Sequence, residues 1–183
     1  MIAALALVLL TADGPAVHGG AELGLGAGVP FRLARAGFQF GFKPYLELEV
    51  APRVFVGASL PLGFGFFTAN GSGEVASASY TAIDIMPGLH GAFAVLDWVY
   101  AALDLGLGPN VLVSRVDINF GGFRSSQTEN RTFFAMRVAL EVVVVPPSLS
   151  GVTLGVVPFE ILGRVGDSTF SEYRISVVVG YRR

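Results

Sequence analysis

The chain has 183 residues, enough for one domain, with a net charge of -2, no cysteine, and 14% charged against 52% apolar residues. A soluble domain carries about a quarter charged residues, and a mean hydropathy of +0.63 is too high for one. This net charge gives no electrostatic case for binding nucleic acid. The lack of cysteine excludes disulfides and thiolate metal sites.

The first 16 residues are typical of a cleaved secretory signal. Residues 2–10, IAALALVLL, form a short apolar run that small residues follow as far as Ala16. The run is too short to span a bilayer, and no basic residue precedes it. We expect cleavage after Ala12 or Ala16, which leaves 17–183 as a single β-barrel domain.

Beyond the signal, apolar residues alternate with small or polar ones in eight successive segments. This period of two predicts β-strands with one apolar face. The closing segment shows it best, because Tyr173, Ile175, Val177, Val179 and Tyr181 share one face. The other face carries small or cationic residues and one valine: Arg174, Ser176, Val178, Gly180 and Arg182. The eight predicted strands cover about 19–29, 38–50, 54–66, 80–94, 98–112, 133–145, 152–162 and 173–183.

The connections between these strands alternate between long and short. Long loops follow the odd-numbered strands, the longest being 67–79 and 113–131, and short turns follow the even-numbered ones. An even number of strands with this alternation is the outer-membrane pattern. The sequence therefore predicts an all-β fold, an eight-stranded antiparallel up-and-down transmembrane β-barrel, with both termini in the periplasm.

Two places depart from regular alternation. In the seventh strand Phe159 and Ile161 fall out of phase with Val152 and Leu154, so we expect a bulge near Val157. After residue 113 the alternation continues with the opposite parity. We interpret this as a second bulge that carries the fifth strand beyond the membrane.

The chain resembles the small eight-stranded outer-membrane barrels of the OmpA/OmpX type. The resemblance covers about 19–183 and includes the ending VVVGYRR, which is similar to the family's C-terminal assembly signal. It implies that the barrel-assembly machinery recognises the last strand. The final residue is Arg183, where the family has an aromatic residue, and no peptidoglycan-binding domain follows.

Aromatic residues gather near the ends of the predicted strands, as expected for rings that settle at the two membrane interfaces. The predicted belt at the long-loop end contains Phe38, Phe40, Phe64, Phe66, Tyr80, Phe134 and Tyr173, and the belt at the short-turn end contains Phe93, Trp98 and Tyr181.

On the inward faces, the first, third and fifth strands contribute mostly glycine, serine or alanine, and the even-numbered strands contribute most of the large polar residues. Charges in such an interior need partners or water. We predict a plugged, salt-bridged lumen whose polar network consists of Glu22, Lys43, Glu47, Glu49, Asp84, His90, Asp104, Arg137, Glu141 and Arg174.

We predict no catalytic residues, no cofactor and no metal. His90 and Asp84 are the one pair that a catalytic test would address, because triads assemble from distant residues. A soluble lipocalin-like barrel would place mostly glycine in water. A helix over 91–113 would place Asp97 and Asp104 in lipid, at about 2.5–3.5 kcal/mol each.

We therefore expect a monomeric outer-membrane protein with a structural or surface-interaction role, surrounded by outer-membrane lipid and lipopolysaccharide and without a nucleic-acid partner. A narrow pore or transporter for small solutes, and a lipid-modifying enzyme, remain the alternative functions. The loops at 67–79 and 113–131 are the candidate interaction sites.

Overall fold

The computed structural model describes residues 16–30, 35–70, 75–120, 123–166 and 171–183. Apart from Ala16, the predicted signal peptide lies outside the described residues. Within them, no helix is long and apolar enough to cross a membrane. The strands are β1 (Val17–Pro30), β2 (Gly37–Ala51), β3 (Val54–Ser59), β4 (Leu62–Asn70), β5 (Val75–Ile85), β6 (Gly88–Leu96), β7 (Val99–Phe120), β8 (Phe123–Val144), β9 (Val152–Arg164) and β10 (Glu172–Arg182).

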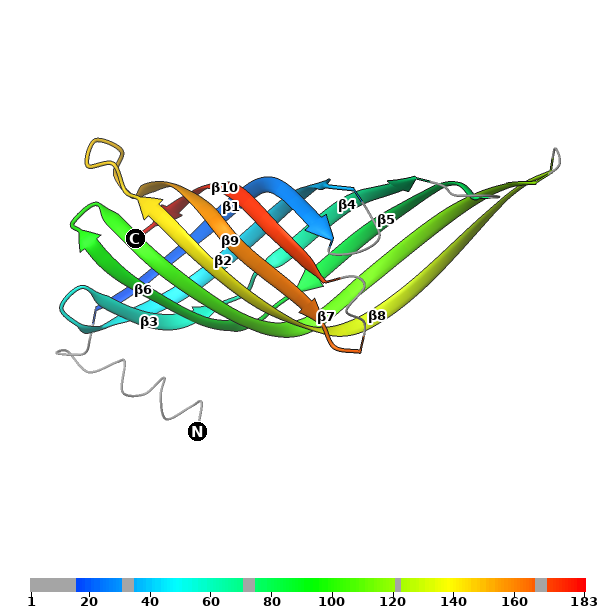
Figure 1. Cartoon of the computed structure of the whole chain (residues 1–183). Coiled ribbons are helices and arrows are strands. Elements are labelled where there is room, and N and C mark those ends of the chain that lie inside the picture. Colours follow the sequence, from blue (N-terminus) through cyan, green and yellow to red (C-terminus); the bar gives the residue numbers. More distant parts are fainter. Residues whose placement is uncertain (1–15, 31–34, 71–74, 121–122, 167–170) are drawn as a thin grey trace.

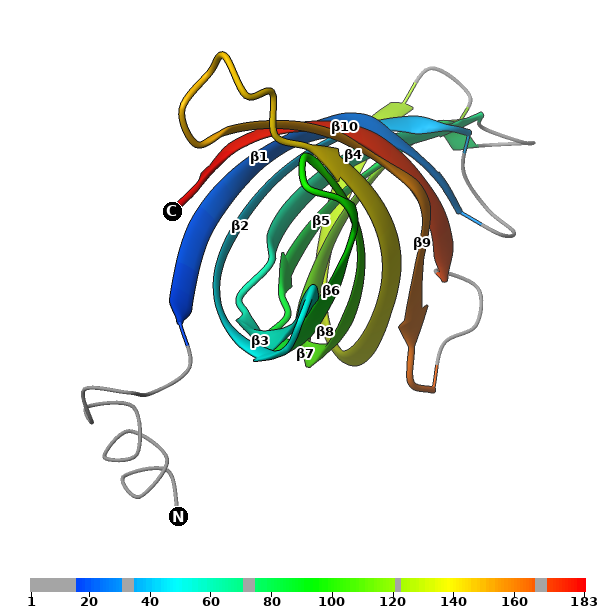
Figure 2. The ribbon, with the colours of Figure 1, turned by 90° about the vertical axis from the view of Figure 1, so that its left-hand side faces the viewer.

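The strands form one antiparallel sheet that closes on itself. β1 pairs with β2 on one side and with β10 on the other, so the first and last strands meet (Figure 2). Beyond that pairing, Gly19 and Arg183 exchange two backbone hydrogen bonds of 2.9 Å each. Closure leaves the barrel wall without a free edge, which confirms the predicted up-and-down barrel.

Ten strands make eight spans, because two spans are interrupted by proline. β3 and β4 both pair with β2 in one continuous register, and the interruption falls at Pro61. β5 and β6 likewise continue each other along β7 across Pro87. Proline has no N–H to donate to the ladder. The remaining donors hold the spans together, since the N–H of Leu60 bonds Pro44 and that of Met86 bonds Pro61.

The strands extend farther beyond the barrel at one end than at the other. Tight connections join β2 to β3 and β6 to β7 at the end where β1 begins and β10 finishes (Figure 1). At the opposite end β7 and β8 project as a hairpin. The predicted loops 67–79 and 113–131 are therefore mostly strand: β4 reaches Asn70, β5 starts at Val75, and β7 and β8 extend to Phe120 and Phe123.

Polar side chains lie inside the barrel and apolar ones outside. Of the described residues, 16 polar or charged side chains are buried, while most large aliphatic and aromatic side chains on the opposite strand faces are exposed. A soluble protein has the reverse distribution. An apolar outer band around a polar interior is the arrangement of a barrel whose solvent is lipid.

One predicted bulge is confirmed and the other is wrong. Near Val157 the registers of β9 with both β8 and β10 shift, as expected. β7 and β8, in contrast, pair without a shift from Val99↔Val144 to Phe120↔Phe123. The parity of the pattern changes because the surroundings change: beyond Val113 the outward residues include exposed Arg115 and Asn119, which face water rather than lipid.

Candidate functional site

Lys43 is the centre of the polar cluster in the half of the lumen nearer the short turns. Its Nζ lies 2.7 Å from Glu22 Oε2 and 3.1 Å from Asp104 Oδ2, and it also contacts Glu141. The four residues come from β2, β1, β7 and β8. One buried ammonium therefore joins three carboxylates from different parts of the wall.

His90 lies beside this cluster between two carboxylates. Its Nδ1 is 2.9 Å from Asp104 Oδ1 and its Nε2 is 3.4 Å from Glu47 Oε2. The Ser59 hydroxyl donates to the same Asp104 oxygen at 2.9 Å. In a catalytic triad the base instead accepts the proton of the nucleophile. Among the described residues, the hydrogen-bonding side chains around His90 are the carboxylates of Asp104 and Glu47, and no serine hydroxyl is hydrogen-bonded to it.

Asp84, the predicted partner of His90, belongs to a second cluster nearer the hairpin. Arg174 is its centre: Nη2 lies 2.6 Å from Asp84 Oδ2, Nη1 lies 3.3 Å from Glu160 Oε1, and the guanidinium also contacts Glu172. Arg137 approaches Glu160 from the other side at 3.0 Å. The structure therefore separates Asp84 from His90, so the pair singled out for a catalytic test does not exist.

Four members of this second cluster are absent from the predicted network: Asn110, Glu160, Arg164 and Glu172. Arg164 contacts Glu172 at 3.6 Å and donates to Asn110, which in turn donates to Asp84. Glu160 follows the bulge, so its parity could be read only by continuing the strand past Val157. Arg164 and Glu172 lie just beyond the predicted ends of their strands, and longer strands would have placed both inside.

Apolar clusters cover the polar interior at both ends. At the hairpin end the buried residues are Phe67, Ala82 and Leu112, and the rings of Tyr80 and Phe133 pack against them. At the short-turn end the ring of Tyr100 packs against a second buried group, which consists of Phe55, Ala92, Ala94 and Ala102.

Arg182, one residue from the C-terminus, completes the cover at the short-turn end. Its guanidinium carbon lies 3.8 Å from the centre of the Tyr100 ring and 4.5 Å from that of Phe55. The same group lies 2.7 Å from Glu47 Oε1. The side chain thus links the closing strand to β2, β3 and β7 by ionic and cation–π contacts.

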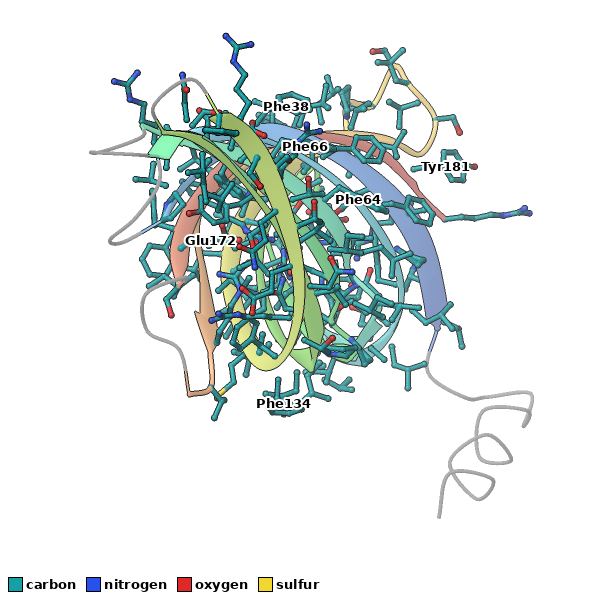
Figure 3. The ribbon with its side chains drawn as sticks, turned by 90° about the vertical axis from the view of Figure 1, so that its right-hand side faces the viewer. Phe38, Phe64, Phe66, Phe134, Glu172 and Tyr181 are labelled. Carbon is teal, nitrogen blue, oxygen red and sulfur yellow. The ribbon has the colours of Figure 1, made fainter. Side chains whose placement is uncertain are left out.

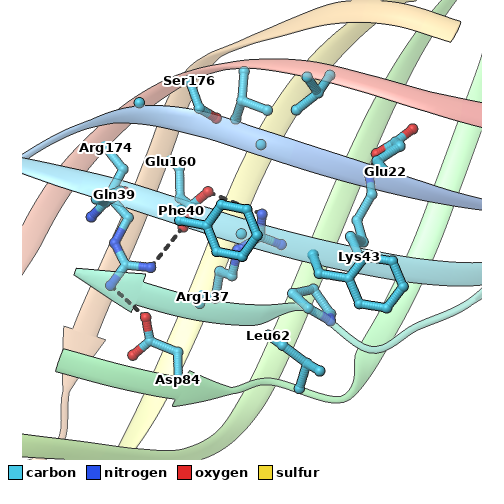
Figure 4. Close-up of a pocket in the computed structure, with 18 of the residues that line it drawn as sticks. Glu22, Gln39, Phe40, Lys43, Leu62, Asp84, Arg137, Glu160, Arg174 and Ser176 are labelled. Carbon is cyan, nitrogen blue, oxygen red and sulfur yellow. Dashed lines mark hydrogen bonds and ion pairs between the residues drawn. The ribbon is translucent and has the colours of Figure 1, made fainter.

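Between the two charged clusters the lumen holds a cavity of about 70 Å³. Its lining includes Lys43, Arg137 and Arg174, and several glycines leave it room (Figure 4). A second cavity of about 20 Å³ lies near Arg182 and shares Glu22 with the first. A cavity needs roughly 10–15 Å³ of such volume to hold one water molecule, so the smaller space suits about one water and the larger one a few.

The structure brings nine of the ten predicted network residues into the two clusters and leaves one outside. Glu49 lies at the β2–β3 turn, where it accepts the backbone N–H of Arg53 at 3.1 Å. Arg53 has a positive φ of 69°, so this bond holds a strained turn position rather than a lumenal charge.

Nine of the ten predicted belt residues point outward, and Figure 3 shows Phe38, Phe64, Phe66, Phe134 and Tyr181 on the outside with Glu172 within. Tyr80 is the exception, and its assignment to the belt is wrong. It shares the parity of Asp84 and packs inward with Phe67 and Phe133. Tyr173 faces outward, where its ring meets that of Phe159 at 5.9 Å.

The β7–β8 hairpin carries the one long stretch of free sheet edge among the described strand pairings. β9 pairs with β8 only from Ala135 onward, and Val165 bonds the carbonyl of Phe134 at 2.8 Å. Backbone groups in an antiparallel pair alternate in direction. Like Phe134, the even-numbered residues therefore turn their N–H and C=O away from β7: Arg124, Ser126, Thr128, Asn130 and Thr132.

Side chains on the hairpin neutralise one another locally. Arg131 binds Glu129 through two contacts of 2.8 and 3.1 Å, and this hydrogen bonding lowers the pKa of Glu129. Hydrogen bonds from Ser126 and Ser77 and the nearby Arg115 lower the pKa of Asp117. Both carboxylates are therefore held in the ionised form beside their arginines. Phe123, which is 82% exposed, lies near the tip of the hairpin.

No protein-family model and no curated protein matches the sequence. The structure is similar to that of Ail, the attachment invasion locus protein of Yersinia pestis, with a TM-score of 0.54 and 13% identity over 92% of this chain and 99% of Ail. It is also similar to a major outer membrane protein of Thermus thermophilus, with a TM-score of 0.51 and 14% identity over 92% of this chain and 100% of the other. At these identities the similarity concerns the fold, and the chain has the fold of the small outer-membrane β-barrels of the OmpA/OmpX type.

Proposed function

We propose that this protein is an outer-membrane surface-interaction protein, and that the free edge of β8 binds extended segments of a partner outside the cell. The observation that carries the proposal is the row of outward-turned backbone groups from Arg124 to Thr132. An extended segment can add to such an edge as a further strand, with main-chain hydrogen bonds supplying the affinity.

The composition of the edge supports this function. Proteins usually protect exposed edges with proline, charged side chains (lysine above all), bulges or short strands, and of these devices residues 123–134 carry only the charges of Arg124, Glu129 and Arg131. Residues 123–134, FRSSQTENRTFF, contain no proline, lysine or glycine, and their pairing with β7 has no bulge. Polar β-compatible residues keep the edge soluble yet open to pairing. The name of Ail, an attachment protein, agrees with a role at the surface.

The proposed setting is the cell outer membrane, with outer-membrane lipid and lipopolysaccharide around the apolar band and both termini in the periplasm. The short-turn end, where β1 begins and β10 finishes, is the periplasmic end in this proposal. The assembly machinery would recognise β10, with Tyr181 as its outward terminal aromatic. Each barrel is a monomer within its own membrane.

The contents of the lumen support the proposal that the barrel does not conduct ions or small solutes. Charged side chains from opposite walls meet in ion pairs, the cavities are small, and aromatic residues cover both ends. These features disfavour the narrow pore considered as an alternative.

The function is tested by removing one edge donor. Purified protein in nanodiscs is panned against a phage-displayed library of twelve-residue peptides. In Thr128→Pro the outward N–H is lost while the bonds to β7 remain, and we expect roughly tenfold weaker binding of the selected peptides, about one lost strand contact. Thr128→Val keeps the N–H and should bind as the parent does. Equal binding by the proline variant, or failure to select any peptide, would overturn the proposal.

A further inference from the structure

We infer that the partner of the β8 edge is the β8 edge of a second copy of this chain, paired antiparallel so that two barrels in facing membranes are joined head to head. This inference rests on the proposed function and names its partner. It follows from the self-complementarity of residues 123–134 in one register.

That register is centred on Thr128. Two identical antiparallel strands are related by a two-fold axis, so each contact occurs twice. With Thr128 opposite the partner's Thr128, Ser126 faces the partner's Asn130 and Arg124 faces the partner's Thr132. Each such pair exchanges two backbone hydrogen bonds. All five residues with outward-turned backbone groups are then used, and none remains over.

The side chains between them also match. Gln127 lies opposite the partner's Glu129, whose charge is already held by Arg131 of its own strand. Ser125 lies opposite the partner's Arg131, so no like charges face each other. At each end Phe123 meets the partner's Phe133, an aromatic cross-strand pair. This contact covers the ring of Phe123, which is 82% exposed in the single chain.

Neighbouring registers fit less well. A register centred on Glu129 places two carboxylates directly opposite each other. It also pairs Arg124 with the partner's Phe134, whose carbonyl is already bonded by Val165. A register centred on Gln127 moves Thr132 past the partner's Phe123, so its N–H and C=O find no partner among the described residues of that edge.

Charge disfavours an in-register parallel pairing of two copies within one membrane. Two barrels inserted side by side in the same orientation present their β8 edges in parallel. An in-register parallel pair sets Arg124 against its own copy, which is repulsive, and also brings the Glu129–Arg131 pairs of the two strands side by side with like charges opposed. The antiparallel pair avoids this, and the projection of the hairpin beyond the barrel gives it reach (Figure 1).

Disulfide trapping tests the register, because the natural chain has no cysteine. At the two-fold axis Cα atoms of a hydrogen-bonded pair lie about 5.5 Å apart, within disulfide range. Two vesicle populations carrying differently tagged Thr128→Cys protein are mixed and oxidised. We expect covalent dimers that contain both tags, roughly ten times more than Ser126→Cys forms with itself.

The matched arm mixes Ser126→Cys protein in one population with Asn130→Cys protein in the other. The register predicts a mixed dimer from this pair and little homodimer from either variant alone. Equal cross-linking at every position, or dimers only within one vesicle population, would overturn the inference. Loss of trapping while peptides still bind the edge would refute the second copy as partner and leave the proposed function standing. Heat-modifiable gel mobility confirms that each variant is folded.

Discussion

Replacing Lys43 with methionine tests whether the lumenal network holds the barrel together. The variant keeps most of the side-chain volume and removes only the ammonium. Lys43 is 9% exposed at its side chain and faces carboxylates at 2.7 and 3.1 Å, besides its contact with Glu141. Without it, three of the buried carboxylates in this half of the lumen lose their nearest cation. The other cationic contacts here, among the described residues, are those of His90 with Asp104 and Glu47 and of Arg182 with Glu47.

The expected loss is large because the abandoned charges stay buried. Removing one partner of a buried ion pair costs about 3–5 kcal/mol, and here one cation serves three acids. With an unfolding slope of about 2 kcal/mol per molar urea, the midpoint should fall by about 2 M. Such a loss is a large share of the roughly 5–15 kcal/mol that stabilises a folded domain.

The assay is equilibrium urea unfolding of the barrel refolded into lipid vesicles, followed by tryptophan fluorescence and heat-modifiable mobility. The matched control is Arg53→Met, which breaks the Arg53–Asp97 contact of 2.9 Å between side chains 54% and 88% exposed. An exposed pair contributes about 1 kcal/mol at most. Adding Glu141→Gln to Lys43→Met should restore part of the loss. Equal small shifts for Lys43→Met and Arg53→Met would refute the reasoning.

Four further predictions concern the wall and the lumen. Gly57→Ala should lower the free energy of unfolding by about 1–3 kcal/mol through overpacking, because its new Cβ would collide with the backbone of Leu46 and Glu47. In the control Gly163→Ala the new Cβ meets nothing within 4 Å, so the urea midpoint should not change. Arg182→Ala should slow folding and lower the urea midpoint, because it removes the ionic contact of β10 with Glu47 and its cation–π contacts with Phe55 and Tyr100. Arg183→Phe, at an exposed position, should leave folding rates intact or improve them, and slower folding than the parent would give Arg183 another purpose. In planar bilayers the protein should show no sizeable single-channel conductance, and steady open channels would contradict the plugged lumen.

The spans and their faces could be predicted because alternation is local information. A period of two fixes which side chains share a face, and it also located the irregularity near Val157. His90 and Asp104 are direct cross-strand neighbours in β6 and β7. Their pairing could have been predicted, because the two residues lie equally far along the chain from the tight turn at residues 97–98. Tyr80 has the same parity as the inward-facing Asp84, and this parity predicts an inward ring. The belt assignment relied instead on the position of Tyr80 near the end of its predicted strand.

The rest depended on distances across the barrel. The partners of Lys43 at Asp104 and Glu141 lie 61 and 98 residues away, on walls that meet only when the sheet closes. Which carboxylate a lumenal cation meets is set by how the registers of eight spans add up around the ring. Alternation within a single strand contains no such information.

The two faces of β7 exchange polarity where the strand leaves the lipid, while the edge of the neighbouring β8 stays open. Within the band that faces lipid its outward residues are apolar, such as Leu105 and Leu107, and beyond Val113 its outward residues are polar. The inner face changes the opposite way, from Asp104 to buried Leu112 and half-buried Val116. Both faces of the hairpin are thereby matched to their surroundings, and the chain crosses from lipid to water without a break in register. What stays unmatched is the row of backbone groups on β8, since a side-chain pattern can satisfy a face of a sheet but not its edge. A strand from another molecule can satisfy it, and this is the reason to look for the protein's partner there.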